Sequence, residues 1–165
     1  MAAIRHAAAR RRGVTLIEMV IVVSLLALLA GIMYPSVASG LDSLRLSSAA
    51  ESIASFLNAG MNHAERRRVP VMVEVAKSEN ALYLRSTEAG WVRKLEMPDG
   101  VLVHDVQPVP PAPPEEEHNL VRYLLYPGGT PPRITVTVAN LRGAKRIVRV
   151  DPVTGVSEIQ RTVEP

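Results

Sequence analysis

The 165-residue chain contains no cysteine, which excludes disulfide bonds and thiolate metal sites. Aromatic residues are scarce, with one Trp, four Tyr and one Phe, so few side chains are available to stack on single-stranded nucleic acid. The sequence also has no Gly-rich phosphate loop, no nucleophile elbow and no pair of histidines at metal-ligand spacing. These absences argue against an enzyme and against a bound cofactor. They favour a structural or binding protein.

Excess positive charge is confined to the start of the chain. Four of the 19 Lys and Arg residues lie before Val14, which leaves 15 basic against 16 acidic residues in the rest. A nucleic-acid-binding protein usually has a basic body and not only a basic tail. The nearly neutral body therefore argues against nucleic acid as a partner.

One long hydrophobic run is present, from Val14 to Tyr34, and Glu18 is its only charged residue. As a helix it would be about 31 Å long, close to the ~30 Å hydrocarbon core of a bilayer. The arginines that precede it predict a cytoplasmic N-terminus. The run is too long for the apolar core of a secretory signal peptide, which is about 7 to 15 residues. We therefore expect a single-pass membrane anchor.

Glu18 is unusual in such an anchor, because a lone carboxylate costs on the order of 2.5 to 3.5 kcal/mol at the bilayer centre and less near an end. It ends the motif Gly-Val-Thr-Leu-Ile-Glu, residues 13–18, which follows three arginines. This motif resembles the prepilin leader motif of type IV pilins and type II secretion pseudopilins. The resemblance implies that a prepilin peptidase cuts after Gly13, removing a leader of residues 1–13. It also implies methylation of the new amine on Val14.

Cleavage would give Glu18 a partner. Its carboxylate lies four residues beyond the new amine on Val14 and can pair with that amine or with one on a neighbouring subunit. In a medium of low dielectric constant, burying an ion pair costs far less free energy than burying a lone charge. Breaking the pair leaves one buried charge without a partner. We predict that Glu18 sets the register between N-terminal helices during assembly. The alternative is a glutamate that the membrane tolerates near its cytoplasmic side.

An amphipathic helical half is predicted after the hydrophobic run. Pro35 removes one backbone hydrogen bond and is predicted to kink the helix. Between residues 36 and 68 apolar residues recur every three or four positions, and three arginines at 66–68 suit the C-terminal end of the helix dipole. A nucleic-acid contact is the alternative role for these arginines. We interpret the apolar stripe as the core face of a stem helix: Leu46, Ala49, Ala50, Ile53, Phe56, Leu57, Met61 and Ala64.

Beyond Pro70 the apolar period changes from 3.6 to 2. About eight short alternating runs, separated by turn residues, are predicted to be strands between residues 69 and 161. The sequence therefore predicts an α+β fold in which an antiparallel sheet packs on the carboxyl half of the helix. The expected organisation is a leader, a transmembrane and filament-core helix at 14–34, and a periplasmic globular domain at 35–165.

Residues 108–119 predict an exposed extended loop, because they contain five prolines and three glutamates. We interpret Glu115 to Glu117, with His118, as a solvated charge run, and a divalent cation site is the alternative. His63 and His104 are interpreted as structural or solvated.

The C-terminal half narrows the resemblance. The turns at 127–130, Pro-Gly-Gly-Thr, and at 151–155, Asp-Pro-Val-Thr-Gly, resemble those of the GspH/FimT family. These proteins are minor pseudopilins of type II secretion and minor pilins of type IV pilus systems. We predict positive φ at the turn glycines and side-chain hydrogen bonds to the turn backbone from the polar residues: Gly128, Gly129 and Gly155, and Asp151 and Thr154.

The resemblance implies a structural subunit of the bacterial inner membrane that supports protein secretion or pilus growth. Its expected partners are the inner membrane, the prepilin peptidase, other pseudopilins or pilins, and secreted proteins contacted through the loops. The alternative is a DNA-binding minor pilin for natural transformation. The candidate residues for that role are Arg142, Lys145, Arg146 and Arg149, with Lys145 and Arg149 on one strand face. The resemblance to DNA-binding members implies arginines directly after the glycine of the final turn. Here Val-Ser-Glu follows that glycine, Gly155, which argues against this alternative.

Overall fold

The computed structural model describes residues 14–88, 90–109 and 120–161 of the chain. The chain divides into two compact units, Met1–Ser39 and Gly40–Pro165. The second unit contains both sheets and the hydrophobic core.

Helix α1 (Leu16–Arg67) begins in the first unit and ends in the second. Eight strands follow it in the described residues, close to the ranges that alternation predicted. They are β1 Val71–Ala76, β2 Ala81–Ser86, β3 Val92–Glu96, β4 Val101–Gln107, β5 Leu120–Leu125, β6 Thr135–Asn140, β7 Lys145–Val150 and β8 Ser157–Arg161.

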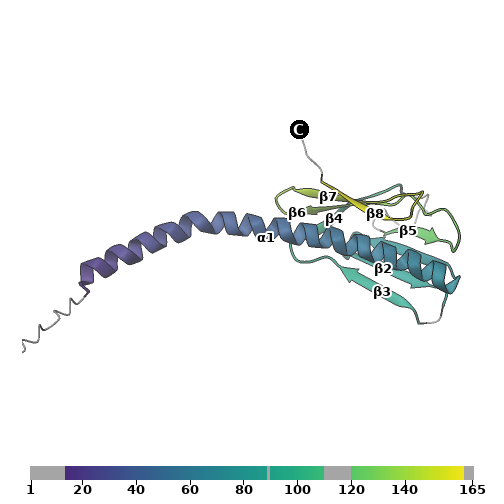
Figure 1. Cartoon of the computed structure of the whole chain (residues 1–165), viewed down its shortest axis with the longest axis horizontal. Helices are drawn as coiled ribbons and strands as arrows, with labels where there is room; N and C mark the ends of the chain where they lie inside the picture. The colour runs from purple at the N-terminus through teal and green to yellow at the C-terminus, as the bar shows by residue number, and fades with distance from the viewer. Residues whose placement is uncertain (1–13, 89, 110–119, 162–165) are drawn as a thin grey trace, which may run out of the picture. The chain divides into compact units, whose positions relative to one another are not determined.

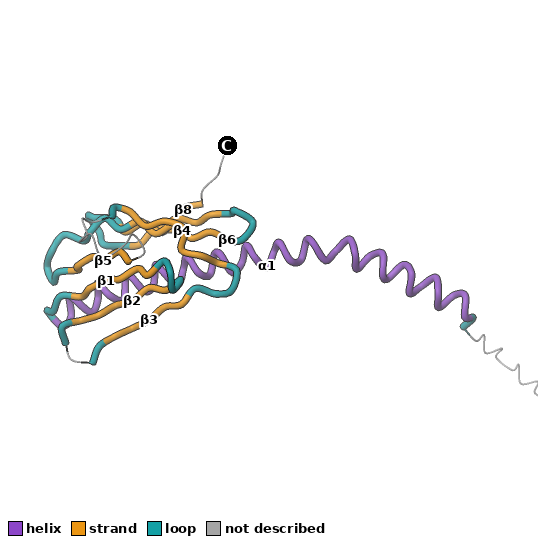
Figure 2. The backbone as a smooth tube through the Cα atoms, turned by 180° about the vertical axis from the view of Figure 1, so that it is seen from behind, coloured by secondary structure: helices purple, strands orange, loops and turns teal. Residues whose placement is uncertain are grey.

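The strands form two antiparallel four-stranded sheets, in the orders β3-β2-β1-β5 and β4-β6-β7-β8. In the view of Figure 1, β7 and β8 lie on one side of α1 and β2 and β3 on the other. Figure 2 shows from behind how β1, β2 and β3 lie side by side along the helix. The predicted α+β, pilin-like fold is confirmed. The division of the strands into two sheets was not anticipated, because it depends on the long-range pairs β1–β5 and β4–β6.

The core lies where the second half of α1 meets both sheets. The predicted apolar stripe is confirmed, since six of its eight residues are buried and the other two, Phe56 and Met61, pack partly buried against the same core. From the sheets, alternate residues such as Val73 on β1 and Val136 on β6 are fully buried. The stripe is thus the surface of α1 that packs in one core with residues of both sheets.

A β-bulge adjusts the alternation of β4. Val103 pairs with Val138 and Asp105 pairs with Thr137, so His104 is the extra residue of the bulge and is exposed. The inserted residue allows both Val103 and Val106 to face the core. His104 is therefore solvated, which was one of its two predicted roles.

Two side chains join the sheets to each other. In the β1–β2 turn, Asn80 donates from Nδ2 to the carbonyl of Val101 at 2.7 Å and accepts from the backbone N–H of Val103 at 2.8 Å. Its amide thus pairs with the outer edge of β4 as a neighbouring strand would. From β5, the hydroxyl of Tyr123 donates to the carbonyl of Pro108 at 2.7 Å.

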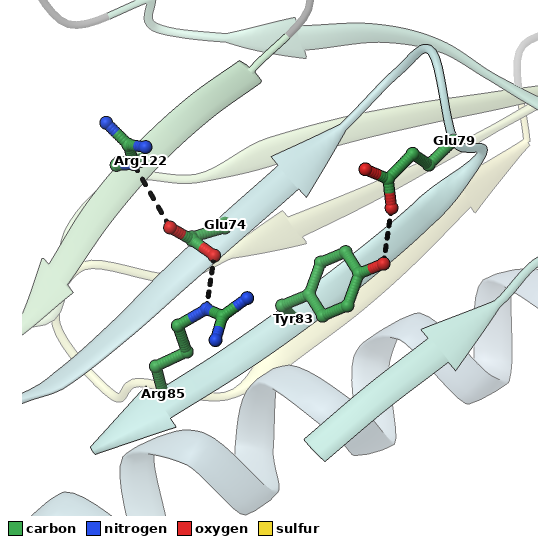
Figure 3. A network of polar contacts seen from close by, with 5 residues as sticks. All are labelled: Glu74, Glu79, Tyr83, Arg85 and Arg122. Atoms are coloured by element: carbon green, nitrogen blue, oxygen red, sulfur yellow. Dashed lines mark hydrogen bonds and ion pairs between the residues drawn. The ribbon is translucent and has the colours of Figure 1, made fainter. Parts of the chain in front are cut away.

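A buried carboxylate lies on the sheet formed by β1, β2 and β5, as Figure 3 shows. Glu74 is 7% exposed, and its two oxygens accept from Arg85 Nε at 2.6 Å and from Arg122 Nε at 3.1 Å. The same view shows the hydroxyl of Tyr83 donating to the carboxylate of Glu79. That hydrogen bond is the main reason that the pKa of Tyr83 is raised. These polar contacts pin three strands together outside the apolar core.

Three arginines end α1. Arg66 and Arg67 occupy its last turn, where positive charge interacts favourably with the helix dipole, as predicted. Arg68 has φ of 57°, and this left-handed residue ends the helix.

Candidate assembly site

The N-terminal end of α1 is capped by a threonine. The Oγ1 of Thr15 accepts a hydrogen bond from the backbone N–H of Glu18 at 3.3 Å, so Thr15 is the N-cap and Glu18 the third helical residue. Thr-x-x-Glu before an apolar run is the signature of a capping box. The cap that Thr15 forms was not anticipated, although the Thr-x-x-Glu spacing is visible in the sequence.

The start of the chain's apolar run, residues 14–33, is exposed along its whole length. Every residue from 14 to 33 is exposed, including Leu16 at 83% and Val22 at 43%. The segment Leu16–Met33 has a mean hydropathy of 2.7 and is long enough to cross a membrane. So much apolar surface is unstable in water. The segment requires either lipid or other helices around it.

This segment contains one serine and one glutamate, which differ in whether a local partner satisfies the side chain. The hydroxyl of Ser24 donates to the carbonyl of Val20 at 2.7 Å, one turn earlier in the helix. Glu18 is the single charge of the segment, and its side chain is exposed. The sole charged group is thus available to a neighbouring molecule.

The structure tests neither the cleavage site at Gly13 nor the kink at Pro35. Gly13 and the rest of the leader lie outside the described residues, so the cleavage site is a prediction. Pro35 lies inside α1, whose backbone is helical on both sides of it. The predicted kink at Pro35 stays a prediction.

The two turns that carried the family resemblance both contact α1. Gly128 has φ of 68°, and its N–H donates to Glu65 Oε1 at 2.7 Å. Gly155 has φ of 72°, and a Cβ on it would lie 3.6 Å from the sulfur of Met61. Between the turns and the helix lies a groove of about 400 Å³. The prediction of positive φ is therefore confirmed at these two glycines.

The prediction of positive φ at Gly129 is wrong. A Cβ at Gly129 would lie 3.2 Å from Cβ of Tyr126 and 3.3 Å from its carbonyl oxygen. Close approach of the backbone, and not its dihedral angle, therefore explains this glycine.

Side chains hold the second turn as predicted. Asp151 Oδ1 accepts from the N–H of Val153 at 2.6 Å and of Thr154 at 3.2 Å, and these bonds lower the pKa of the carboxyl. Thr154 Oγ1 accepts from the N–H of Val156 at 3.3 Å.

The four basic residues proposed for DNA binding do not share one face. Arg142 Nε lies 3.0 Å from Asp42 Oδ2 on α1. Arg146 lies on the strand face that also carries the buried Val148, opposite to Lys145 and Arg149. Arg149 stands directly across from Glu158 of β8. Two of the four cations therefore have an acidic neighbour.

Within the described residues, no three His, Asp or Glu side chains form a group that could hold a metal ion. The predicted acidic run with His118 lies outside that part of the chain.

The apolar segment and the two-sheet unit together define a class. An exposed N-terminal helix with a capped Thr-Leu-Ile-Glu start, continuing as the core helix of an antiparallel α+β unit, is the architecture of pilin-like proteins.

Comparisons with known proteins agree with this class. Residues 8–34 match the family model of the prokaryotic N-terminal methylation motif. Among solved structures, the chain resembles the minor pseudopilin EpsH from the type 2 secretion system of Vibrio cholerae, with a TM-score of 0.55 and 13% identity. The match covers 73% of this chain and 99% of that chain. A search of curated proteins found no match. The predicted leader motif and pilin-like fold are thus confirmed.

Proposed function

We propose that the chain is a minor pseudopilin or minor pilin, a structural subunit of a secretion or pilus filament in the inner membrane. The observation that carries the proposal is the exposed apolar segment, residues 14–33, which lies within the N-terminal methylation motif matched at residues 8–34. Such a helix can first anchor the chain in the membrane and then pack among the same helices of other subunits. The periplasmic side is proposed for the second unit, because the arginines precede the anchor.

Processing is proposed to occur in two steps. A prepilin peptidase cuts after Gly13, and the new amine on Val14 is methylated. Cleavage leaves the apolar segment attached, so the product stays in the membrane. The charged leader, which would prevent burial of the helix end in a filament, is removed.

Mass spectrometry of the protein from its native membrane tests this step. The expected mature N-terminus is Val14 carrying one added methyl group. Gly13→Leu is expected to retain the leader, whereas Gly31→Leu is the matched control, because a Cβ there would meet nothing within 4 Å. Recovery of wild-type protein that still begins at Met1 contradicts the proposal.

Glu18 is proposed to pair with the Val14 amine of its own chain or a neighbouring subunit. The capping geometry allows this role to be separated from helix capping. Glu18→Gln keeps a side chain that can complete the capping box but removes the charge, whereas Glu18→Ala removes both. If the ion pair drives assembly, both variants insert in the membrane and neither co-purifies with other subunits. Normal assembly of Glu18→Gln would limit Glu18 to helix capping.

The type of filament is tested genetically. Deletion of the gene is expected to abolish secretion of exported proteins if the filament serves type II secretion. Loss of pili with normal secretion would assign the chain to a pilus instead.

A further inference from the structure

A basic groove lies in the second unit where α1 ends, apart from the segment and turns described above. Its volume is about 430 Å³, and it is formed by the last turns of α1 and the start of β3. We call it the arginine groove, and its principal lining residues are Asn62, His63, Arg66, Arg67, Trp91 and Arg93.

One wall of the arginine groove is formed by two stacked rings. The imidazole of His63 stacks on the indole of Trp91, with ring centroids 3.7 Å apart and an interplanar angle of 18°. Trp91 is partly buried against the hydrophobic core. Glu88 lies beside this stack, with Oε2 at 3.4 Å from His63 Nε2 and Oε1 at 3.6 Å from Arg67 Nη1. Glu88 therefore compensates Arg67 and holds the β2–β3 turn against α1.

Arg66 and Arg93 are the other two arginines of the groove. Among the described residues, no ion pair joins Arg66 or Arg93 to a carboxylate. The guanidinium of Arg93 lies 6.0 Å from the indole centroid of Trp91, within the range of a cation–π contact. Both side chains are exposed. The groove thus presents two guanidinium groups beside the stacked rings of His63 and Trp91.

We propose that the arginine groove binds an acidic segment of a partner protein, with aspartate or glutamate side chains paired to Arg66 and Arg93. A guanidinium group presents donors in a planar fork that matches a carboxylate. The indole and imidazole supply an apolar wall for the stems of these side chains. The site is independent of the proposed assembly role, since it involves no residue of the apolar segment.

A peptide fits this groove better than single-stranded nucleic acid does. Proteins that bind single strands stack successive bases on several aromatic side chains along a basic track. Here Trp91 is the single Trp, Tyr or Phe lining the groove, and one face of its ring is already covered by His63. The cations also form one compact group and not a track.

Because Trp91 is the sole tryptophan of the chain, its fluorescence reports directly on the arginine groove. The full-length protein in detergent micelles is titrated with an octaglutamate peptide, and with octalysine and an oligothymidylate as comparison ligands. We expect a saturable change in Trp91 emission with octaglutamate at concentrations below about 1 mM, and none with octalysine. Binding is expected to weaken as salt is added.

Two variants distinguish binding in the arginine groove from a non-specific effect of the protein's charge. Arg66→Glu is expected to weaken octaglutamate binding about tenfold or more. Arg45→Glu is the matched control, because it makes the same charge change at an exposed position earlier on α1, and it is expected to bind as the wild type does. Titration midpoints are compared, and circular dichroism confirms that each variant is folded.

Three results would overturn the proposal. They are no saturable change with octaglutamate, equal weakening by Arg66→Glu and Arg45→Glu, and tighter binding of the oligothymidylate than of the peptide. The last would assign the groove to nucleic acid.

Discussion

The two ends of α1 have the same backbone geometry and opposite surroundings. From Leu16 to Met33 every side chain is exposed, whereas Leu46, Ile53 and Leu57 are at most 1% exposed. Hydrogen bonds from side chains in the first segment reach no further than four residues along the chain. In the second unit they join residues up to 99 positions apart, as between Asn58 and Ser157.

This difference shows where each region obtains its stability. The second unit buries its own apolar stripe against two sheets and therefore has a core. The first segment satisfies its backbone within the helix but leaves its apolar surface uncovered, so its stability depends on lipid or on other helices around it. One continuous helix thus serves one self-sufficient region and one dependent region.

The largest expected effect is on stability, and it separates the same Leu→Ala substitution made at the two ends of α1. Leu57→Ala is expected to destabilise the second unit by about 2 to 5 kcal/mol, because it leaves a cavity in the shared core. Leu26→Ala, at a position that is 59% exposed, is expected to leave the stability of that unit unchanged. Thermal unfolding followed by Trp91 fluorescence in detergent measures both. An equal loss in the two variants would show that the regions are not energetically distinct.

Asn80 tests the dependence of the second unit on long-range contacts. Asn80→Gly tolerates the positive φ of 52° but removes both hydrogen bonds to β4, and is expected to cost about 2 kcal/mol. The corresponding local change in the first segment, Thr15→Ala, is expected to fray the helix start without shifting the unfolding of the second unit. Hydrogen exchange at Val103 measures the first effect. Unchanged protection there would contradict it.

Tyr123 makes the stability of the second unit depend on pH. Burial, reinforced by the nearby Asp105 carboxylate, raises its pKa to about 12. Because the folded state holds the proton more tightly than the unfolded state does, this contribution is complete below pH ~10 and is lost as pH rises through about 12. Tyr123→Phe should flatten this decline. Thermal midpoints measured from pH 8 to 11 compare the two proteins, and parallel curves would rule out the effect.

The smallest expected effect concerns the ion pair between Arg142 and Asp42. The side chains are 51% and 32% exposed, so the pair is expected to contribute about 0.5 kcal/mol and less in high salt. A double-mutant cycle with Arg142→Ala and Asp42→Ala measures it. Neither the wild type nor the Arg142→Ala variant is expected to retard DNA in a gel shift. A retardation by the wild type that Arg142→Ala abolishes would instead favour the alternative function.

Periodicity was a sufficient guide to much of the fold. The apolar stripe of α1 and the approximate strand ranges followed from spacing, because burial on one face imposes a period of 3.6 or 2. Pairing order did not follow. β1 pairs with β5, which follows the segment 108–119 in the sequence, and the residues of neither strand specify the other as its partner.

The polar sites divided in the same way. The turn roles of Asp151 and Thr154 were predictable because each side chain bonds to backbone within three residues of itself. The ion pairs of Glu74 were not predicted, since its two arginine partners lie 11 and 48 residues away in the sequence. The hydrogen bonds of Asn80 to β4 were not predicted either, since their partners lie 21 and 23 residues away. Alternation in the sequence already placed Lys145 and Arg149 on one strand face, and in β7 Arg146 lies on the opposite face.

The leader motif, the uncovered apolar helix and the α+β class could be read from the amino-acid sequence alone, since each depends on composition or on a short repeating pattern. Three features follow from tertiary contacts instead: the strands form two sheets, two arginines enclose Glu74, and Arg66 and Arg93 meet beside Trp91 in one groove. The reason is that such contacts join distant segments, and their formation depends on how the whole core packs and not on any local preference.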